Sequence, residues 1–598
     1  MKKTRYSVKT VCLLAMCGVA LFANAQEDKK KEQDLNRQMT LEREYDPSVQ
    51  DASKVNTLPQ VKEPEVRKIP IDYSDYTLAM DPAQQISVLP SGNIMTQMDY
   101  NKRRGYLRLG AGTYMNLNGD FGYHALSTAT DQLSIAFSHR SANGNVKYIQ
   151  LPDEKVKAKI NDNLGGLKYA HAFEKASLNV GLNYGYSAYN YYGLSMSPFS
   201  SLPMQDLLNV ADRETNQVNQ TIAATLGVES KEDADLAYLV DLGFVNFSHK
   251  YGISKDTDGP KETTIEAKVN VSKRFNGDMR FGLEALVEYF NYSLPAEKAL
   301  PNGGLYICEF ENHAEVALHP YYEVEGENWK VRLGANVMLK TGDESLFMAT
   351  PNVAANFEVA DKTELYIKAN GKLYSNSMYE MSKINRYLPA EELTPSRNWL
   401  DGVLGIKSGV APGFWFDIFA GYKMTSDDVL FVPSRTFEEG GFGNFSEAMS
   451  GINTKQLFVG ASLKYSYQQL FELTLKGQYN NWKAEYGDEW IGFSDSSLEH
   501  AWGKPEMELN AGVMVRPMDK LAVALDYSLA TGRYTQLEGA DLYKMNNINE
   551  LNLTATYTLN DTFGFYAKVN NLLSQKYELY YGYPMQRLSA QVGVNINF

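Results

Sequence analysis

The sequence predicts an all-β fold, a transmembrane antiparallel up-and-down β-barrel of about 22 strands that follows a short irregular N-terminal segment. Three observations lead to this prediction. Apolar and polar residues alternate over long segments, tight turns alternate with long connections, and no apolar run beyond the N-terminus approaches the ~18 residues of a membrane helix. Alternation gives each strand one apolar and one polar face, as expected between lipid and a lumen.

The overall composition excludes several classes of protein. The chain has 598 residues and a formal net charge of −14, and it contains no long basic run, which argues against a nucleic-acid partner. Two of its three cysteines, Cys12 and Cys17, lie within the first 25 residues, so only Cys308 remains after processing. A single cysteine makes neither a disulfide framework nor a thiolate metal site.

Residues 1–25 have the three parts of a secretory signal peptide. A charged start is followed by an apolar run over residues 11–22 and by the small-residue cleavage motif Ala-Asn-Ala at residues 23–25. A lipoprotein signal through Cys17 is disfavoured because Met16 precedes it, where a small residue is needed. We therefore expect cleavage after the motif and export into a Gram-negative envelope.

Beyond residue 104 the sequence divides into alternating segments that are predicted to form the barrel, residues 105–598. In residues 329–339, for example, every second residue is apolar. Soluble strands average about five or six residues, whereas a tilted strand needs about 9–11 to cross a bilayer. Because backbone amides in hydrocarbon must be paired within the protein, such strands span a membrane only as a closed barrel. The 22 segments start near residues 105, 117, 132, 164, 177, 217, 235, 262, 278, 310, 328, 346, 363, 402, 413, 455, 470, 505, 520, 548, 562 and 586.

The connections provide an independent test, because every second one is a tight polar turn. Long connections are expected at residues 143–163, 189–215, 250–260, 293–305, 375–399, 425–454, 482–504 and 531–546, and short ones near 116–118 and 341–345 break the trend. An even strand count with this alternation places both termini in the periplasm. A secreted soluble β protein such as a propeller would need shorter strands and a recurring motif of about 40–50 residues, which the sequence lacks.

Residues 26–104 are predicted to be an irregular leader. Prolines recur through the segment at a spacing that disfavours regular secondary structure. These prolines are Pro47, Pro59, Pro64, Pro70, Pro82 and Pro90. The leader is long enough to thread the lumen, and a disordered periplasmic tail is the alternative that the sequence leaves open.

The C-terminal residues resemble the end of TonB-dependent receptors. The matching positions are Val569, Asn571, Leu572 and Tyr577, then Gly-Tyr-Pro at residues 582–584 and the terminal Phe598. The resemblance extends to the strand count and size of the barrel, and it implies transport across the outer membrane. The ending at Phe598 is similar to the signal that barrel-assembly machinery reads.

The chain departs from that family at its N-terminal side. Such receptors carry a TonB-binding segment and a globular plug, both together longer than residues 26–104. Residues 41–59 resemble the leader of plugless, Bacteroidota-type receptor-like barrels, and residues 85–88 are a short run similar to a TonB-binding segment, with nothing plug-like after it. A lumen of 22 strands is too wide for its own side chains to fill, so we expect the leader, inward outer loops or a partner to obstruct it.

Signals of an enzyme or of a cofactor are weak. The sequence has no nucleophile-elbow, zinc-protease or phosphate-loop motif, and we predict no catalytic residue and no cofactor. His313, Glu315 and His319 share one strand face, but the two histidines are six residues, about 20 Å, apart. One ion cannot span that distance, so no metal site is predicted.

Aromatic residues in the long connections are the candidate contacts for an extracellular ligand or partner. Tyr and Trp commonly anchor sugars and protein surfaces. The candidates are Tyr191, Tyr192, Phe199, Phe442, Phe445, Trp490, Phe493 and Trp502. The alternative is the aromatic girdle of the membrane interface, to which we assign Tyr189 and Tyr486. Acidic residues within 488–499 leave a Ca²⁺ site open as a further alternative.

Two function classes remain. The first is a receptor-like transporter or channel for a bulky solute, and the second is a non-transporting scaffold or subunit of an outer-membrane assembly, export or lipoprotein-handling complex. The expected partners are outer-membrane lipid, the barrel-assembly machinery during biogenesis, and surface or periplasmic lipoproteins or other envelope proteins. Copurification distinguishes the two classes, because a scaffold brings a defined set of envelope proteins with it.

Overall fold

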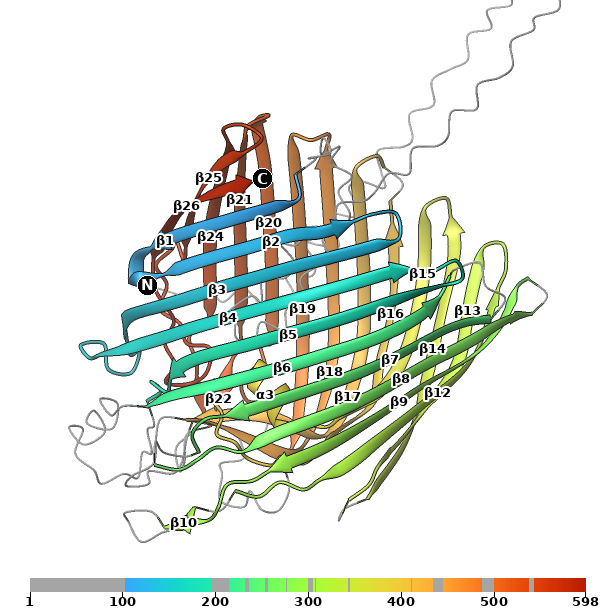
Figure 1. Cartoon of the computed structure of the whole chain (residues 1–598), viewed down its shortest axis with the longest axis horizontal. Coiled ribbons are helices and arrows are strands. Elements are labelled where there is room, and N and C mark those ends of the chain that lie inside the picture. The colour runs from blue at the N-terminus through green and yellow to red at the C-terminus, as the bar shows by residue number, and fades with distance from the viewer. Residues whose placement is uncertain are drawn as a thin grey trace, which may run out of the picture. The chain divides into compact units, whose positions relative to one another are not determined.

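The computed structural model describes residues 103–598 except 195–214, 232–235, 253–255, 276, 300–304, 307, 343–344, 410, 434–444, 487–499 and 537–541. The predicted signal peptide and all but the last two residues of the predicted leader lie outside these described residues. Within them, 22 strands form one antiparallel sheet (Figure 1). No helix in this part of the chain has the length and apolar character needed to cross a membrane.

The strands of the sheet follow one another along the chain. They are β1 (Gly105–Gly112), β2 (Leu117–Ser127), β3 (Asp131–Lys147), β4 (Lys155–Ala172), β5 (Ala176–Asn190), β6 (Asn216–Ser230), β7 (Leu236–His249), β8 (Lys261–Phe275), β9 (Met279–Ser293), β12 (His313–Glu325), β13 (Trp329–Lys340), β14 (Leu346–Ala360), β15 (Thr363–Tyr374), β16 (Ser396–Ser408), β17 (Phe414–Pro433), β18 (Ser446–Tyr467), β19 (Phe471–Glu485), β20 (Met507–Met518), β21 (Leu521–Thr531), β24 (Ile548–Thr558), β25 (Phe563–Asn570) and β26 (Ser589–Asn597).

Each strand pairs with its neighbours in sequence, and β26 pairs with β1, so the sheet closes on itself. In this closing pair Leu107 lies opposite Ile596 and Leu109 lies opposite Val594. The predicted all-β barrel of about 22 strands is therefore confirmed. Closure leaves no unpaired sheet edge, as a membrane-spanning sheet requires.

The two faces of the wall differ as the alternation predicts. On β9, Phe281 and Leu283 are 54% and 45% exposed and point outward. Glu284, the residue after Leu283, points into the lumen. Its carboxylate lies 2.7 Å from the guanidinium of Arg332 on β13. The apolar outer face meets lipid, and charged groups are paired on the inner face.

Several strands are longer than their alternation indicates. The predicted connections at 143–163 and 425–454 are partly wrong, because β3, β4, β17 and β18 continue into them; β18 alone has 22 residues. Polar residues such as Asn145 and Lys157 face each other in this extension. Outside the hydrocarbon a strand needs backbone pairing but no apolar face, so the ladder continues where the hydrophobic period has ended.

Short elements lie in several of the connections between strands. They are the 3-10 turn η2 (Thr113–Met115), the strand pairs β10 (Lys298–Ala299) with β11 (Leu305–Tyr306) and β22 (Tyr534–Thr535) with β23 (Tyr543–Lys544), and helix α3 (Met378–Ile384). Ser377 caps α3, since its hydroxyl accepts a hydrogen bond from the amide of Glu380. Helix α3 belongs to the connection between β15 and β16, residues 375–395, which we call the strap.

Candidate functional site

The long connections meet in a buried cluster at one end of the barrel. We call this cluster the loop core and define it by Tyr148, Tyr189, Tyr191, Tyr192, Leu194, Tyr387, Tyr577, Leu579, Tyr580 and Tyr583. Its residues come from the connections β3–β4, β5–β6, β15–β16 and β25–β26 and from the end of β5. All are less than 9% exposed. The loops of this end therefore pack on one another, as the core of a small domain does.

Tyrosine rings provide most of this packing. The ring of Tyr387 on the strap stacks on Tyr583 at 4.1 Å between centroids, and Tyr192 lies edge-on to both rings. The Tyr148 hydroxyl donates to the carbonyl of Tyr192 at 2.8 Å, and the Tyr580 hydroxyl donates to the carbonyl of Ile384 at 2.8 Å. Such rings bury apolar area, while their hydroxyls tie neighbouring backbones together.

The strap crosses the mouth of the barrel. At one side the guanidinium of Arg386 forms an ion pair with Asp162 on β4, with 3.1 Å between nitrogen and oxygen. At the other side the amide of Asn385 donates to the hydroxyl of Ser446 on β18 at 2.9 Å. Because β4 and β18 lie on nearly opposite sides of the ring, these adjacent strap residues connect two distant walls.

Two further contacts fix the helical half of the strap. The Ser375 hydroxyl donates to the carboxylate of Glu315 on β12 at 2.9 Å. The amide of Tyr379 donates to the carboxylate of Glu262 on β8 at 3.1 Å, and Glu262 is only 1% exposed. The strap is thus attached to inward-facing groups on four strands, β4, β8, β12 and β18.

The connection 571–588 between β25 and β26 begins with a pinned asparagine. Asn571 has a positive φ of 49°, a conformation that asparagine tolerates better than most residues. Its side chain donates to the carbonyls of Gln575 and Gln586 and accepts from the amide of Gln575. This geometry explains why the motif noted in the sequence has asparagine at this position, since the residue turns the chain and closes the base of the connection.

A buried carboxylate links three connections at the centre of the loop core. Glu578 is fully buried and accepts hydrogen bonds from the side chain of Gln150 and from the amide of Gly582. The guanidinium of Arg533 donates to the backbone carbonyls of Glu578 and Leu579. Burial raises the pKa of Glu578 and lowers the pKa of Arg533. Removing either side chain would leave buried hydrogen-bonding groups without partners, so this group holds the connections in a single arrangement.

The structure brings three of the predicted contact residues together and separates a fourth. Tyr191 and Tyr192 are 1% and 4% exposed in the loop core, and Phe445 lies edge-on to Tyr191 at 4.8 Å. Trp502 is buried in a different cluster, with its ring 4.5 Å from that of Tyr486. These side chains pack between loops in this conformation. The other candidates, Phe199, Phe442, Trp490 and Phe493, lie outside the described residues.

The assignment of Tyr189 to the membrane-interface girdle is wrong. Tyr189 is 2% exposed, and its ring lies edge-on to Tyr387 of the strap at 6.0 Å, so it faces the lumen. Sequence reasoning also missed Tyr148, Glu578 and Arg533, because contacts between distant loops leave no periodic pattern. The density of tyrosine in residues 577–583 was the available signal.

The three residues considered for a metal site lie as their spacing predicts, on one lumenal strand face. His319 contacts Asn336 at 2.6 Å between the imidazole Nδ1 and the amide oxygen. His313 and Glu315 approach each other, with 3.7 Å between Nε2 and Oε1. Among the described residues, no three or more His, Cys, Asp or Glu side chains converge closely enough to hold one metal ion.

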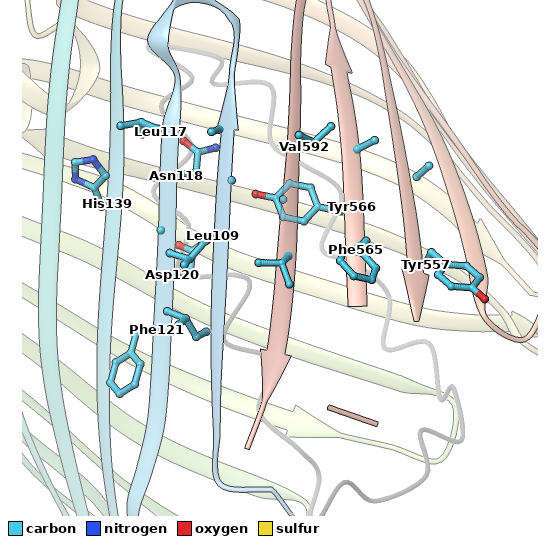
Figure 2. Close-up of a pocket in the computed structure, with 18 of the residues that line it drawn as sticks. Leu109, Leu117, Asn118, Asp120, Phe121, His139, Tyr557, Phe565, Tyr566 and Val592 are labelled. Carbon is cyan, nitrogen blue, oxygen red and sulfur yellow. The ribbon is translucent and has the colours of Figure 1, made fainter. Parts of the chain in front are cut away.

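An apolar groove of about 1020 Å³ lies where β26 meets β1 (Figure 2). Leu109 on β1, Phe565 on β25 and Val592 on β26 line it and are 45–66% exposed on the outer face. Small outward residues between them, such as Ala111 and Ala567, hollow the wall. The groove therefore belongs to the lipid-facing side of the closure.

The fold is similar to that of several solved outer-membrane proteins. No protein-family model matches the chain, and no curated protein is similar to it in sequence. Among solved structures, the siderophore receptor PiuA from Acinetobacter baumannii has a TM-score of 0.61 at 10% identity, over 83% of this chain and 82% of that one. The ferric-catecholate import receptor Fiu from Escherichia coli K12 gives 0.59 at 10% identity, over 83% and 82%. The ferripyoverdine receptor of the Pseudomonas aeruginosa outer membrane gives 0.60 at 12% identity, over 83% and 70%.

At these identities the likeness establishes the fold alone. A barrel of this fold belongs in the outer membrane of a Gram-negative bacterium. The three similar proteins are named as receptors, not as enzymes.

Proposed function

We propose that the chain is a TonB-dependent-receptor-like outer-membrane transporter or channel for a bulky solute, and that its own loops obstruct the lumen. In this proposal both termini are periplasmic, residues 26–104 form no full plug, and the loop core faces the cell exterior. The observation that carries the proposal is the strap, which connects opposite walls and joins the loop core over the mouth.

The dimensions of the barrel make such an obstruction necessary. A 22-stranded barrel encloses more space than its inward side chains fill, and an open bore of that size would leak solutes. Inward loops are one of the three obstructions expected from the sequence, and the contacts of the strap with β4 and β18 support this one. The leader is proposed to act as a second obstruction from the periplasmic side.

Passage of a solute then requires rearrangement of the loop core. A ligand shifts such an equilibrium only when it binds the open arrangement more tightly than the closed one. Phe199, Phe442, Trp490 and Phe493 are the proposed first contacts of the solute. Tyr191, Tyr192, Phe445 and Trp502 pack between loops, so they would join a binding surface only after the loops separate.

Planar-bilayer conductance of the purified mature protein tests the proposal. The double variant Asn385→Ala/Arg386→Ala removes the side-chain attachments of the strap to β4 and β18, and we expect its conductance to rise several-fold over wild type. Lys383→Ala is the matched control, because Lys383 is an exposed cation on the same strap. Deleting residues 26–104 should raise the conductance further. Unchanged conductance in both the strap variant and the deletion would contradict the proposal.

One observation favours a second candidate, a subunit of an outer-membrane complex. The groove at the β26–β1 closure is concave and apolar, which suits a membrane-embedded partner as well as acyl chains. Purification in mild detergent separates the two functions. A transporter should be released alone or with a lipoprotein lid, whereas a complex subunit should copurify with several envelope proteins at fixed stoichiometry.

A further inference from the structure

The hairpin of β3 and β4 extends beyond the neighbouring hairpin of β1 and β2 (Figure 1). Nearer the tight turns, Ile135 and Phe137 of β3 are 38% and 44% exposed on the lipid-facing side. The pairing of β3 with β2 ends at Ser141, whereas β3 and β4 stay paired as far as Lys147 and Lys155. The hairpin therefore has an extension that lies beyond the apolar band of the wall.

The inward face of this extension is apolar and buried. Val146 and Val156 lie directly opposite each other, are 4% and 7% exposed, and pack against the loop core. Because successive residues of a strand point to opposite sides, the residues that alternate with these valines point outward. Four of these outward residues are lysines, which we call the lysine strip: Lys147 on β3 and Lys155, Lys157 and Lys159 on β4.

The lysine strip has little counter-charge around it. Lys147 lies directly opposite Lys155, and like charges in opposed positions destabilise a sheet. Among the described residues, no acidic side chain forms an ion pair with any of the four lysines. Asp153 and Glu154 in the adjoining turn offset at most half of the charge. A bound anion would therefore relieve the repulsion within the strip.

The backbone of the strip is held in place although β5 ends beside it. The side chain of Asn190, the last residue of β5, accepts a hydrogen bond from the amide of Lys159 at 2.7 Å. The same side chain donates to the carbonyl of Lys157 at 2.8 Å, so it continues the ladder along β4. Successive lysines of the strip on β4 are about 7 Å apart along the strand. Their spacing is thus set by a paired strand and not by a loose loop.

Two further zones lie below the strip on the same wall. The imidazole of His139 contacts the side-chain oxygens of Asn163 at 2.8 Å and Ser141 at 3.0 Å, so these outward polar groups satisfy one another. Below them, the apolar groove at the β26–β1 closure reaches β3, where Phe137 and His139 line it (Figure 2). Toward the loop end, the wall therefore presents an apolar groove, a hydrogen-bonding zone and a basic strip in that order.

We propose that this wall binds a phosphate-bearing glycolipid of the outer leaflet. The three zones match the acyl chains, sugars and phosphates of such a molecule in their order from hydrocarbon to water. Lysine binds phosphate as a point charge, and basic clusters at a membrane surface recognise anionic headgroups. The inference rests on the proposed function only for its orientation, in which the loop core faces the cell exterior.

Native mass spectrometry of the mature, full-length protein released from detergent tests the site. The probe is purified diphosphoryl lipid A, and fully dephosphorylated lipid A is the comparison ligand. We expect wild type to bind the phosphorylated lipid at least tenfold more tightly. The strip variant Lys155→Gln/Lys157→Gln/Lys159→Gln should bind diphosphoryl lipid A at least tenfold more weakly than wild type. Conductance is not measured, so this test fails independently of the proposed transport function.

The matched control is Lys175→Gln/Lys231→Gln/Lys520→Gln. It removes three exposed lysines at the end of the tight turns and changes the net charge equally, so it should bind like wild type. Gel mobility before and after heating should show that each variant is assembled. If the strip variant does not assemble, the two lipids compared on wild type decide the question.

Four results would overturn the proposal. Wild type may not distinguish the two lipids, the strip variant may bind like wild type, or the control may lose affinity equally. In the fourth, inositol hexakisphosphate binds wild type as tightly as diphosphoryl lipid A does, which would identify the strip as a site for a soluble anion.

Discussion

The two ends of the barrel are built by different rules. At the end of the tight turns, each connection is determined within a few residues, as where Asn560 accepts hydrogen bonds from the amides of Thr562 and Phe563. At the end of the long connections, the decisive contacts join distant parts of the chain, as between Gln150 and Glu578. The wall therefore follows from local pattern, whereas the mouth depends on tertiary packing.

The largest expected effect concerns Phe598, at the turn end. Its amide and carbonyl exchange hydrogen bonds of 2.9 Å with Gly105, and its ring stacks on Tyr123 across the closure. Two lost backbone hydrogen bonds at about 1 kcal/mol each reduce the closed population by at least about tenfold. Deleting Phe598 should therefore lower the heat-modifiable, assembled fraction by that factor. Tyr467→Ala, at an exposed residue beside another turn, should not. Equal loss in both variants would show that closure has no special role.

An intermediate effect is expected at the loop end from Glu578. Its pKa is raised, so the closed loop core favours the protonated carboxyl. The contribution of protonated Glu578 to the stability of the closed loop core is complete below the ordinary glutamate pKa. It is lost as the pH rises through the raised pKa. Each unit of difference between the ordinary and the raised pKa changes the population of the open loop core by up to about tenfold.

The expected readout is a wild-type conductance that increases with pH over this window. Glu578→Gln should remove most of that dependence, because its side chain stays neutral. Asp561→Asn changes an exposed carboxylate at the turn end and should leave the pH profile as it is. A glutamine variant with the full wild-type profile would show that another group controls the loops.

The smallest expected effect comes from alanine substitutions at two glycines in the tight turns. One substitution adds only backbone strain, and the other also adds a steric clash. Gly277 has a φ of +79° with open space where a Cβ would lie, so Gly277→Ala should cost only about 1–2 kcal/mol of conformational strain. Gly413 has a φ of +74°, but an added Cβ would lie 2.1 Å from the carbonyl oxygen of Ser466. The Gly413→Ala variant should therefore unfold at a clearly lower temperature than the Gly277→Ala variant. Both variants should conduct like wild type. Equal unfolding temperatures would contradict this distinction.

Much of the wall could be predicted because its residues face only two environments. Leu182 and Tyr184 on β5 are exposed to lipid, while Asn183 between them faces the lumen, and period-two alternation reports this arrangement directly. The closing strand β26 and the terminal Phe598 were likewise visible in the sequence. The full lengths of β4 and β18 were not visible in the sequence, because the lipid-facing apolar residues that mark a strand stop before these strands end.

The loop core could be predicted only in part. Tyr191 and Tyr192 were chosen for their aromatic character, but the sequence did not show that Tyr387 and Tyr583 bury them. The partner of each ring lies hundreds of residues away, and no local preference encodes such a pairing. The approach of His313 to Glu315, by contrast, was visible in the sequence, because residues two apart share one face of a strand.

The strap has a mechanical consequence for the whole ring. A sheet of 22 strands closed on itself can flatten without breaking any of its ladders, because neighbouring strands need only bend slightly against one another. The strap, which is attached to both β4 and β18, restrains that flattening along one diameter. Loss of this attachment would therefore alter the outline of the entire rim. The single ion pair between Arg386 and Asp162 thus influences strands with which it makes no contact.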